Sequence, residues 1–123
     1  PLIKNIEFFS EKTIVNNEEK IKQVLNDVDL HEFTKNFKEI NLYEDGQNIS
    51  GGQLQRLGIA RALYRNPEIL LFDEITNGLD EISEANVLNT ISNLKGKITI
   101  IMISHKENNL KDCDKIINLE NLI

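Results

Sequence analysis

The first half of the chain carries apolar residues at helical spacing. One helix face is predicted between residues 16 and 30 by four apolar residues at positions i, i+3, i+4 and i+7: Ile21, Val24, Leu25 and Val28. Residues 31–40 predict a second, shorter helix with Phe33 and Phe37 on one side. A loop with the turn signal Asp45-Gly46 follows, and a third helix is predicted from about residue 50 to residue 65. This half of the chain is therefore predicted to be helical.

The pattern changes after Asn66-Pro67, which is a boundary signal. Residues 68–73 and 97–105 contain continuous apolar runs typical of buried parallel strands, and residues 115–123 predict a third strand. The helix predicted between the first two strands has five apolar residues on a common face and ends with a glycine cap: Ile82, Ala85, Leu88, Ile91, Leu94 and Gly96. Residues 107–114 predict a short helix or turn. The alternation of strands and helices predicts an α/β fold with a parallel sheet and right-handed crossovers.

Composition narrows the class of protein. With 123 residues, 40% of them apolar and 28% charged, the chain has the composition of one soluble globular domain or part of one. No apolar run approaches the roughly 18 residues that cross a bilayer. The chain starts with neither Met nor a signal-peptide pattern, so we expect a segment of a longer polypeptide. The single cysteine, Cys113, allows no internal disulfide, and the net charge of −6 argues against sequence-independent binding to nucleic acid.

Two glycines stand at the entrance of the third predicted helix, where each costs up to about 1 kcal/mol relative to alanine if it is helical. Ser50 and Gln53 match a capping box, which is a structural interpretation that leaves Gly51 and Gly52 unexplained. In a functional interpretation, the missing side chains let an anion approach the free N–H groups of the first turn. The stretch from Gly46 to Gly51 has the glycine spacing of a phosphate loop of the G-x-x-x-x-G-K-[ST] type, but Gly52 stands where the motif requires lysine. No other stretch of the chain fits this motif.

Polar residues lie at the carboxyl ends of the first two predicted strands, the edge where parallel sheets bind ligands: Asp73, Glu74, Ser104 and His105. One of two adjacent carboxylates can hold Mg²⁺, often through water, and the other can orient and deprotonate an attacking water. The alternative is a strand that simply ends in a polar turn. Asp80 is placed to cap the next helix, and a lone histidine after a strand is ordinarily a loop or core residue.

Four motifs follow one another along the chain: Ile49-Ser50-Gly51-Gly52-Gln53, Ile69 to Glu74, Asn77-Gly78-Leu79-Asp80 and Met102 to His105. In this order and spacing they resemble the signature, Walker B, D-loop and switch-histidine motifs of ABC-type ATPases, the nucleotide-binding motors of ATP-binding-cassette transporters. Ile49 stands where the family signature has Leu, and Gly78 where its D-loop commonly has Ala. Residues 1–9 and 43–47 resemble segments of exporter-type members, although Tyr43 replaces a glycine.

The resemblance covers the chain from the helical region to its end and implies part of a P-loop NTPase fold. Residues 1–65 would be the helical signature subdomain with its incoming segment, and residues 66–123 the C-terminal part of the RecA-like α/β core. In the family, the Walker A loop and the Q-loop lie N-terminal to these regions. The chain therefore resembles the C-terminal portion of a motor domain, and alone we expect it to be soluble and inactive as an ATPase.

The resemblance also implies a mechanism and partners. ATP would lie between two ATPase domains facing head to tail, as a homo- or heterodimer, with Ser50-Gly51-Gly52-Gln53 contacting the nucleotide held by the partner. Asp73 would hold Mg²⁺ through water, Glu74 would polarise the attacking water, and His105 would contact the γ-phosphate. Asp80 would communicate across the interface. The second partner would be a transmembrane domain, which would place the ATPase on the cytoplasmic face of the plasma (inner) membrane, with export as the expected direction.

Two other hypotheses are open at this point. The first is a soluble ATPase of the same superfamily, of the chromosome-maintenance or translation-factor kind. The chromosome-maintenance kind should show coiled-coil heptads, and the sequence has none. The second is a non-enzymatic interaction module, which the joint presence of Asp73, Glu74 and His105 disfavours.

Overall fold

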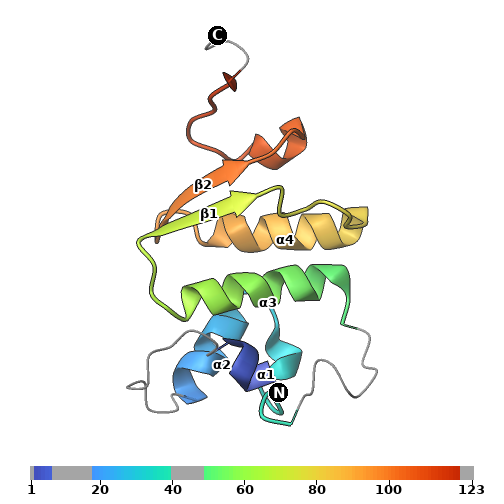
Figure 1. Ribbon diagram of the computed structural model, residues 1–123, viewed down its shortest axis with the longest axis vertical. Coiled ribbons are helices and arrows are strands. Elements are labelled where there is room, and N and C mark those ends of the chain that lie inside the picture. The colour runs from blue at the N-terminus through green and yellow to red at the C-terminus, as the bar shows by residue number, and fades with distance from the viewer. Residues whose placement is uncertain (1, 7–17, 40–48, 120–123) are drawn as a thin grey trace.

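The computed structural model describes residues 2–6, 18–39 and 49–119, which form helices and a small parallel sheet (Figure 1). The α-helices among them are α1 (Leu2–Ile6), α2 (Glu18–Asp27), α3 (Gly51–Leu63) and α4 (Glu81–Asn93). The strands are β1 (Ile69–Asp73) and β2 (Thr99–Ile103), and two short 3-10 helices are η1 (His31–Phe33) and η2 (Glu107–Leu110). Helices followed by a strand-helix-strand unit agree with the predicted α/β class.

The elements lie in layers (Figure 1). The two strands lie on one side of α4, α3 lies on the other side, and α1 and α2 lie beyond α3. Helices α3 and α4 begin at the same end of the molecule, which is also where both strands end. Buried apolar side chains from every layer belong to one cluster, represented by Leu2, Leu25, Leu57, Phe72 and Val87. This cluster holds the strand ends and the helix starts together.

Both long helices begin with a capping side chain. The hydroxyl of Ser50 accepts a hydrogen bond from the N–H of Gln53 at 3.1 Å, and the N–H of Ser50 donates to Gln53 Oε1 at 2.9 Å, so the predicted capping box is present. Asp80 Oδ1 accepts from the N–H of Ser83 at 2.9 Å, which confirms the predicted cap of α4. Gly96 has a φ of +79° just after α4, a conformation that glycine adopts without steric cost.

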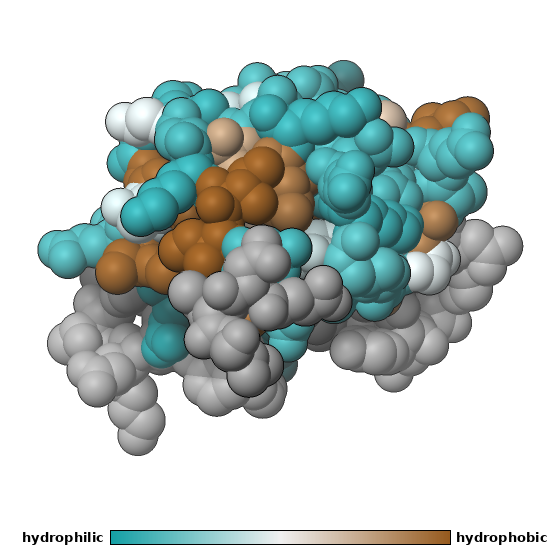
Figure 2. Space-filling view, turned by 90° about the horizontal axis from the view of Figure 1, so that it is seen from above, coloured by the Kyte–Doolittle hydropathy of each residue, from teal (hydrophilic) through white to brown (hydrophobic). Residues whose placement is uncertain are grey.

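The two strands pair in parallel in the register that places Ile69 opposite Thr99. Burial alternates along β1: Leu70 and Phe72 are buried, whereas Leu71 is 64% exposed. The prediction that the strands are buried on both faces is therefore wrong within the described residues, because these residues cover only one face of the sheet. The exposed face carries Ile69, Leu71, Ile101 and Ile103. Figure 2 shows apolar side chains gathered on the surface seen from above.

Residues 31–39 do not form the α-helix that was predicted over residues 31–40, and residue 40 lies outside the described residues. The 3-10 helix η1 is followed by turns as far as residue 39. Thr34 Oγ1 donates to the carbonyl of His31 at 2.7 Å, and such local side-chain bonds offer the backbone an alternative to a helical ladder. Phe33 and Phe37 are both buried in the core, so hydrophobic burial directs the segment even without an α-helix.

The predicted face of α4 is only partly right. Ser83 lies against Gly52 of α3, and the buried face continues at three-four spacing from there through Val87, Thr90, Ile91 and Leu94. Ile82 is 76% exposed because it precedes Ser83 by one position, about 100° around the helix. Ala85 is exposed as well, and Leu88 is half-buried. The contact between α3 and α4 therefore sets the rotation of α4.

The predicted third strand is wrong for residues 115–119, which form no strand and leave Ile116, Ile117 and Leu119 exposed. An apolar run does not become a strand unless a neighbouring strand supplies hydrogen-bond partners. The last four residues of that predicted strand, and the predicted loop around Asp45-Gly46, lie outside the described residues. No helix in the described ranges combines the length and apolarity that crossing a membrane requires.

The alternation along β1 predicts unequal costs for two neighbouring leucines in the 123-residue chain. Leu70→Ala should lower the free energy of unfolding by about 2–5 kcal/mol, because it leaves a cavity in the core. Leu71→Ala should change it by less than about 0.5 kcal/mol, because Leu71 faces solvent. Urea denaturation measures both. Equal losses would contradict the assignment of one covered and one exposed face.

Candidate functional site

Parallel pairing brings two polar segments to one edge of the sheet. Asp73, the last residue of β1, lies opposite Ile103, the last residue of β2. The N–H of Glu74 donates to the carbonyl of Ile103 at 3.0 Å, so the alignment continues one residue beyond the strand. His105 follows two residues after Ile103. The structure thereby brings together Glu74 and His105, which the sequence placed at the ends of separate strands.

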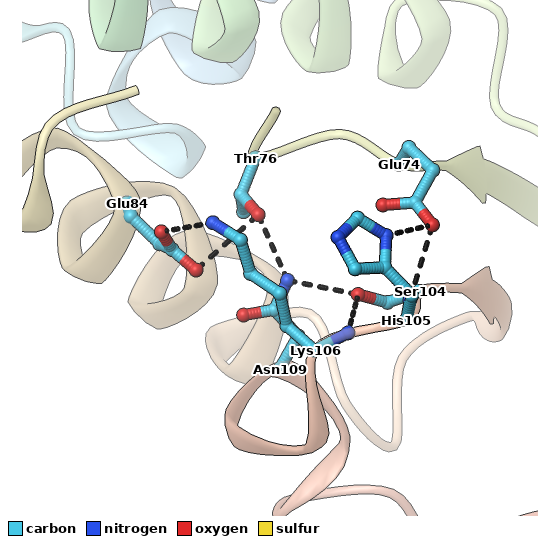
Figure 3. Close-up of polar contacts among 7 residues, drawn as sticks. All are labelled: Glu74, Thr76, Glu84, Ser104, His105, Lys106 and Asn109. Carbon is cyan, nitrogen blue, oxygen red and sulfur yellow. Dashed lines mark hydrogen bonds and ion pairs between the residues drawn. The ribbon is translucent and has the colours of Figure 1, made fainter. Parts of the chain in front are cut away.

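Glu74 and His105 are in direct contact (Figure 3). Glu74 Oε1 accepts a hydrogen bond from the backbone N–H of His105 at 3.1 Å and lies 2.8 Å from the ring Nδ1 of the same residue. The hydrogen bond from the His105 side chain lowers the pKa of the Glu74 carboxyl, against a smaller opposite effect of desolvation. The imidazole is largely exposed, and no described residue bonds to its Nε2. Nε2 is therefore the ring nitrogen open to a ligand.

The backbone of Glu74 adopts an uncommon conformation. Its φ is +49°, in the left-handed region that costs a residue with a side chain about 1–2 kcal/mol. Two hydrogen bonds hold it there: the bond to Ile103, and a bond from the N–H of Asn77 to the carbonyl of Glu74 at 3.0 Å. Strain of this kind is concentrated at functional sites, where the surrounding structure maintains it. The turn aims the Glu74 carboxylate at the end of β2.

One oxygen of Glu74 has no hydrogen-bond partner among the described residues. Oε2 is buried and makes no hydrogen bond within the described residues, while the Asp73 side chain lies beside it in sequence on an exposed strand end. No cluster of three or more His, Cys, Asp or Glu residues that could hold a metal occurs in residues 2–6, 18–39 and 49–119. Mg²⁺ is commonly bound by one or two carboxylates together with water and substrate phosphates. The adjacent carboxylates fit that mode, and they do not fit a cage built from protein ligands alone.

The start of α3 provides the second part of the site. Ser50 and Gly51 are exposed, and no described residue accepts a hydrogen bond from the N–H of Gly51 or Gly52. The Ser50 hydroxyl accepts the capping bond from Gln53, so its own hydrogen stays available for donation. These donors lie at the positive end of the helix dipole. The arrangement is suited to an anion at Gly51.

Close packing supplies a structural reason for both glycines that the sequence did not show. A Cβ on Gly52 would lie 2.9 Å from the Cβ of Ser83, and a Cβ on Gly51 would lie 3.0 Å from Leu79 Cδ2. Gly52 is buried for this reason, whereas Gly51 is exposed. At Gly51, close packing and the approach of an anion are therefore compatible reasons for the missing side chain. At Gly52, the packing against α4 accounts for it.

The same packing brings Asp80 next to the start of α3. Asp80 lies between Leu79 and Ser83, the two residues that approach the glycines. The backbone N–H and then the hydroxyl of Ser83 donate to the Asp80 carboxylate, and these bonds lower its pKa. Asp80 is itself exposed. Its principal contacts are those of a helix cap, as the sequence predicted.

Four polar residues around the Glu74–His105 pair were not singled out in the sequence analysis: Thr76, Glu84, Lys106 and Asn109. Thr76 and Asn109 are buried, and they are linked to each other and to Glu84, Ser104 and Lys106 by hydrogen bonds (Figure 3). No motif marks Asn109, which lies in the polar stretch of η2. Only the fold reveals that it is buried between two loops.

Comparison with known proteins identifies the family. Residues 2–77 match the family described as "ABC transporter". Over 135 aligned residues, covering 95% of this chain, the sequence is 33% identical to a "Probable ABC transporter ATP-binding/permease protein" of Haemophilus influenzae. Over 94 residues, covering 74% of this chain, it is 40% identical to the alpha-hemolysin translocation ATP-binding protein HlyB of Escherichia coli O157:H7. The chain belongs to the ABC transporter family.

These relatives are much longer than the chain. The alignments span 24% of the Haemophilus protein and 13% of the Escherichia protein. A third relative, the Lactococcus lactis protein named for lactococcin-G processing and transport, is 49% identical over 79 residues, which are 64% of this chain and 11% of that protein. The family match contains Ser50 to Gln53, Asp73 and Glu74, whereas Asp80 and His105 lie beyond it.

Two glycines of α3 provide a matched test of the packing against α4. Gly58→Ala should raise the free energy of unfolding by about 0.5–1 kcal/mol, because alanine favours the helix and its Cβ meets no atom within 4 Å. Gly52→Ala should lower it by about 1–3 kcal/mol, because the Cβ collides with Ser83. Urea denaturation of the 123-residue chain gives both values. A stabilised Gly52→Ala variant would show that α3 and α4 are not so close.

The contact of Glu74 with His105 predicts a shift in a single titration. His105→Ala should raise the pKa of the Glu74 carboxyl towards its ordinary value, because the variant removes the side-chain hydrogen bond that lowers it most. The measurement is ¹³C NMR titration of the Glu74 carboxyl in the 123-residue chain. His31→Ala is the control, because His31 contacts Asn26 and Asp29 instead. An unchanged pKa of Glu74 in His105→Ala would refute the contact.

Proposed function

We propose that this chain is part of an ABC transporter ATPase that hydrolyses ATP to drive transport, with export as the direction. The observation that carries the proposal is the Glu74–His105 pair at the exit of β1, where a strained glutamate beside Asp73 is held by a histidine from the turn after β2. A carboxylate next to a second carboxylate at a strand exit is suited to metal-assisted phosphoryl transfer. Family membership supports ATP as the nucleotide.

Each residue receives a role that its surroundings support. Asp73 is exposed and would hold Mg²⁺ through water, and the ion would neutralise charge on the phosphate oxygens. Glu74 would polarise the attacking water through its carboxylate, which His105 holds in place by hydrogen bonds to Oε1. His105 would meet the γ-phosphate through Nε2, because Nδ1 already contacts Glu74. In these roles the residues position the reactants and balance charge.

The start of α3 would act on a second nucleotide site. Ser50 and Gly51 present exposed donors, with Gln53 completing the cap, and together they would contact the γ-phosphate of ATP bound to a second ATPase domain. Asp80 is exposed beside them and would lie at the same interface. In this arrangement the described β-α-β unit would be part of a larger P-loop NTPase core, with residues 1–65 as its helical subdomain and residues 66–123 as its C-terminal part.

The relatives support a membrane partner. One is named as an ATP-binding/permease protein and another as a translocation ATP-binding protein. A third is named as an "ATP-dependent lipid A-core flippase", 42% identical over 78 residues that cover 63% of this chain and 13% of that protein. We therefore propose that the ATPase works with a transmembrane domain on the cytoplasmic face of the plasma membrane.

The test is a conservative change at Glu74 in the full-length protein that contains this chain. Glu74→Gln should lower kcat for ATP hydrolysis by about 10²–10⁴-fold, because the amide cannot accept a proton from water, while ATP binding is retained. Phosphate release and nucleotide binding are measured on the same preparation. Glu107→Gln is the control, since Glu107 is exposed on η2 and belongs to no part of the site. Undiminished hydrolysis in Glu74→Gln would refute the proposed role.

A further inference from the structure

A closed ring of hydrogen bonds lies beside the Glu74–His105 pair (Figure 3). It runs through five residues: Thr76, Glu84, Lys106, Ser104 and Asn109. Thr76 comes from the turn after β1 and Glu84 from the first turn of α4. Ser104 and Lys106 come from the turn after β2, and Asn109 comes from η2. Four separate parts of the fold are thereby linked by polar contacts alone.

The ring has an ionic side and a buried side. On the ionic side, Lys106 Nζ donates to Glu84 Oε2 at 2.7 Å, and Thr76 Oγ1 donates to the other Glu84 oxygen at 3.3 Å. The ring is continued by the backbone N–H of Lys106, which donates to Ser104 Oγ at 3.1 Å. The Glu84 side chain is 19% exposed, so its carboxylate is only partly in contact with water. Such a contact weakens less with solvent screening than an ion pair on the surface.

Asn109 closes the ring on its buried side. Its Nδ2 donates to Thr76 Oγ1 at 2.8 Å and to Ser104 Oγ at 3.1 Å, so both amide hydrogens are used. The side chain thus bridges the turn after β1 and the turn after β2. Asn109 Oδ1 is buried without a hydrogen-bond partner in the described part of the chain. A buried amide that leaves its oxygen unsatisfied is costly. This cost indicates that Asn109 is present because its side chain bridges the two turns.

Members of the ring are close in sequence to both candidate catalytic residues. His105 stands between Ser104 and Lys106, both of which are members, and Glu74 lies two residues before Thr76. The two turns that carry Glu74 and His105 are therefore held together by Asn109. No member of the ring is one of the residues placed at the nucleotide. The ring can consequently affect where Glu74 and His105 lie without contacting ATP.

We propose that Asn109 is a positioning residue, which holds the turn after β1 against the turn after β2 so that Glu74 and His105 stay in contact. The ion pair of Lys106 with Glu84 anchors the same ring to the start of α4. This inference rests on the proposed function of Glu74 and His105. Small displacements of catalytic groups are expensive, since about 1 Å can cost 10²-fold in rate. Loss of the bridge should therefore lower kcat and leave KM for ATP unchanged.

The experiment compares two adjacent asparagines in the full-length protein. Asn109→Ala should lower kcat for ATP hydrolysis at least tenfold, with KM for ATP within twofold of the unchanged protein. Asn108→Ala is the matched control, because Asn108 lies on the same 3-10 helix, is exposed and takes no part in the ring. Its kcat and KM should both stay within twofold. If Asn109 served only general stability, Asn109→Ala would reduce the fraction of enzyme that is active. Active-site titration with a nucleotide analogue would detect this loss.

A second pair of variants avoids any change at the buried position. Lys106→Met opens the ring at its partly exposed ion pair and should lower kcat at least threefold. Lys106→Arg keeps the charge and a donor to Glu84, so it should restore kcat to within twofold. This pair decides the question if Asn109→Ala does not fold. Recovery by arginine supports the ion pair of the ring, and an unchanged pKa of the Glu74 carboxyl in Lys106→Met would exclude a direct effect of the Lys106 charge on Glu74.

The outcomes separate this inference from the proposed function. Wild-type kcat in Asn109→Ala and Lys106→Met, together with loss of hydrolysis in Glu74→Gln, would overturn the positioning role and keep the proposed function. A rise in KM at unchanged kcat would also overturn it. Full hydrolysis in Glu74→Gln would overturn the proposed function and with it the inference. A lowered kcat at constant KM in both ring variants, absent in Asn108→Ala, supports it.

Discussion

Parallel pairing of β1 with β2 is the constraint on which the candidate site depends. Five paired positions bring the two strands to a common end, and the bond from the N–H of Glu74 to the carbonyl of Ile103 extends the pairing into the turn. Without that alignment, Glu74 and His105 would be separated by an intervening helix and a strand. The pair, the strained backbone of Glu74 and the neighbouring ring of hydrogen bonds all follow from the same edge of the sheet.

A second constraint is the close approach of α3 and α4. Because Gly52 has no side chain, Ser83 can lie against the first turn of α3, and this contact also orients the buried face of α4. Asp80 caps α4 at the same place, so the start of α3 and the turn before α4 form one surface. The polar end of the molecule therefore combines two helix starts with two strand ends (Figure 1). A helix start suited to an anion and a pair of carboxylates can share this end because both long helices run away from it.

Much of the local structure could be predicted from the sequence, because it depends on neighbours in the chain. The periodicity around Ile21 and the capping box of Ser50 are interactions over three or four residues, and both are present. The two strands, the cap at Asp80 and the left-handed Gly96 are equally local. The sequence also led to the ABC transporter family, which the comparisons confirm.

Errors appeared where an interaction with a distant part of the chain was decisive. The second helix gave way to turns around Thr34, and the apolar run after Lys115 found no strand to pair with in the described residues. On α4 the predicted face was right at Ile91 and Leu94 but wrong at Ile82 and Ala85, since contact with Gly52 selects Ser83 at the start of the helix. In each case the residue pattern allowed more than one arrangement, and packing selected among them.

The sequence by itself determined which residues cap the two long helices and where the two strands lie, because these choices depend on backbone propensity and on side chains a few positions apart. It also supplied the residues of the candidate site: two adjacent carboxylates, a histidine and two glycines at a helix start. Only the tertiary structure decided that Glu74 meets His105 and that Asn109 bridges their turns, since residues more than thirty positions apart are joined there. Such contacts depend on how strands align and helices pack, and no short-range pattern encodes them.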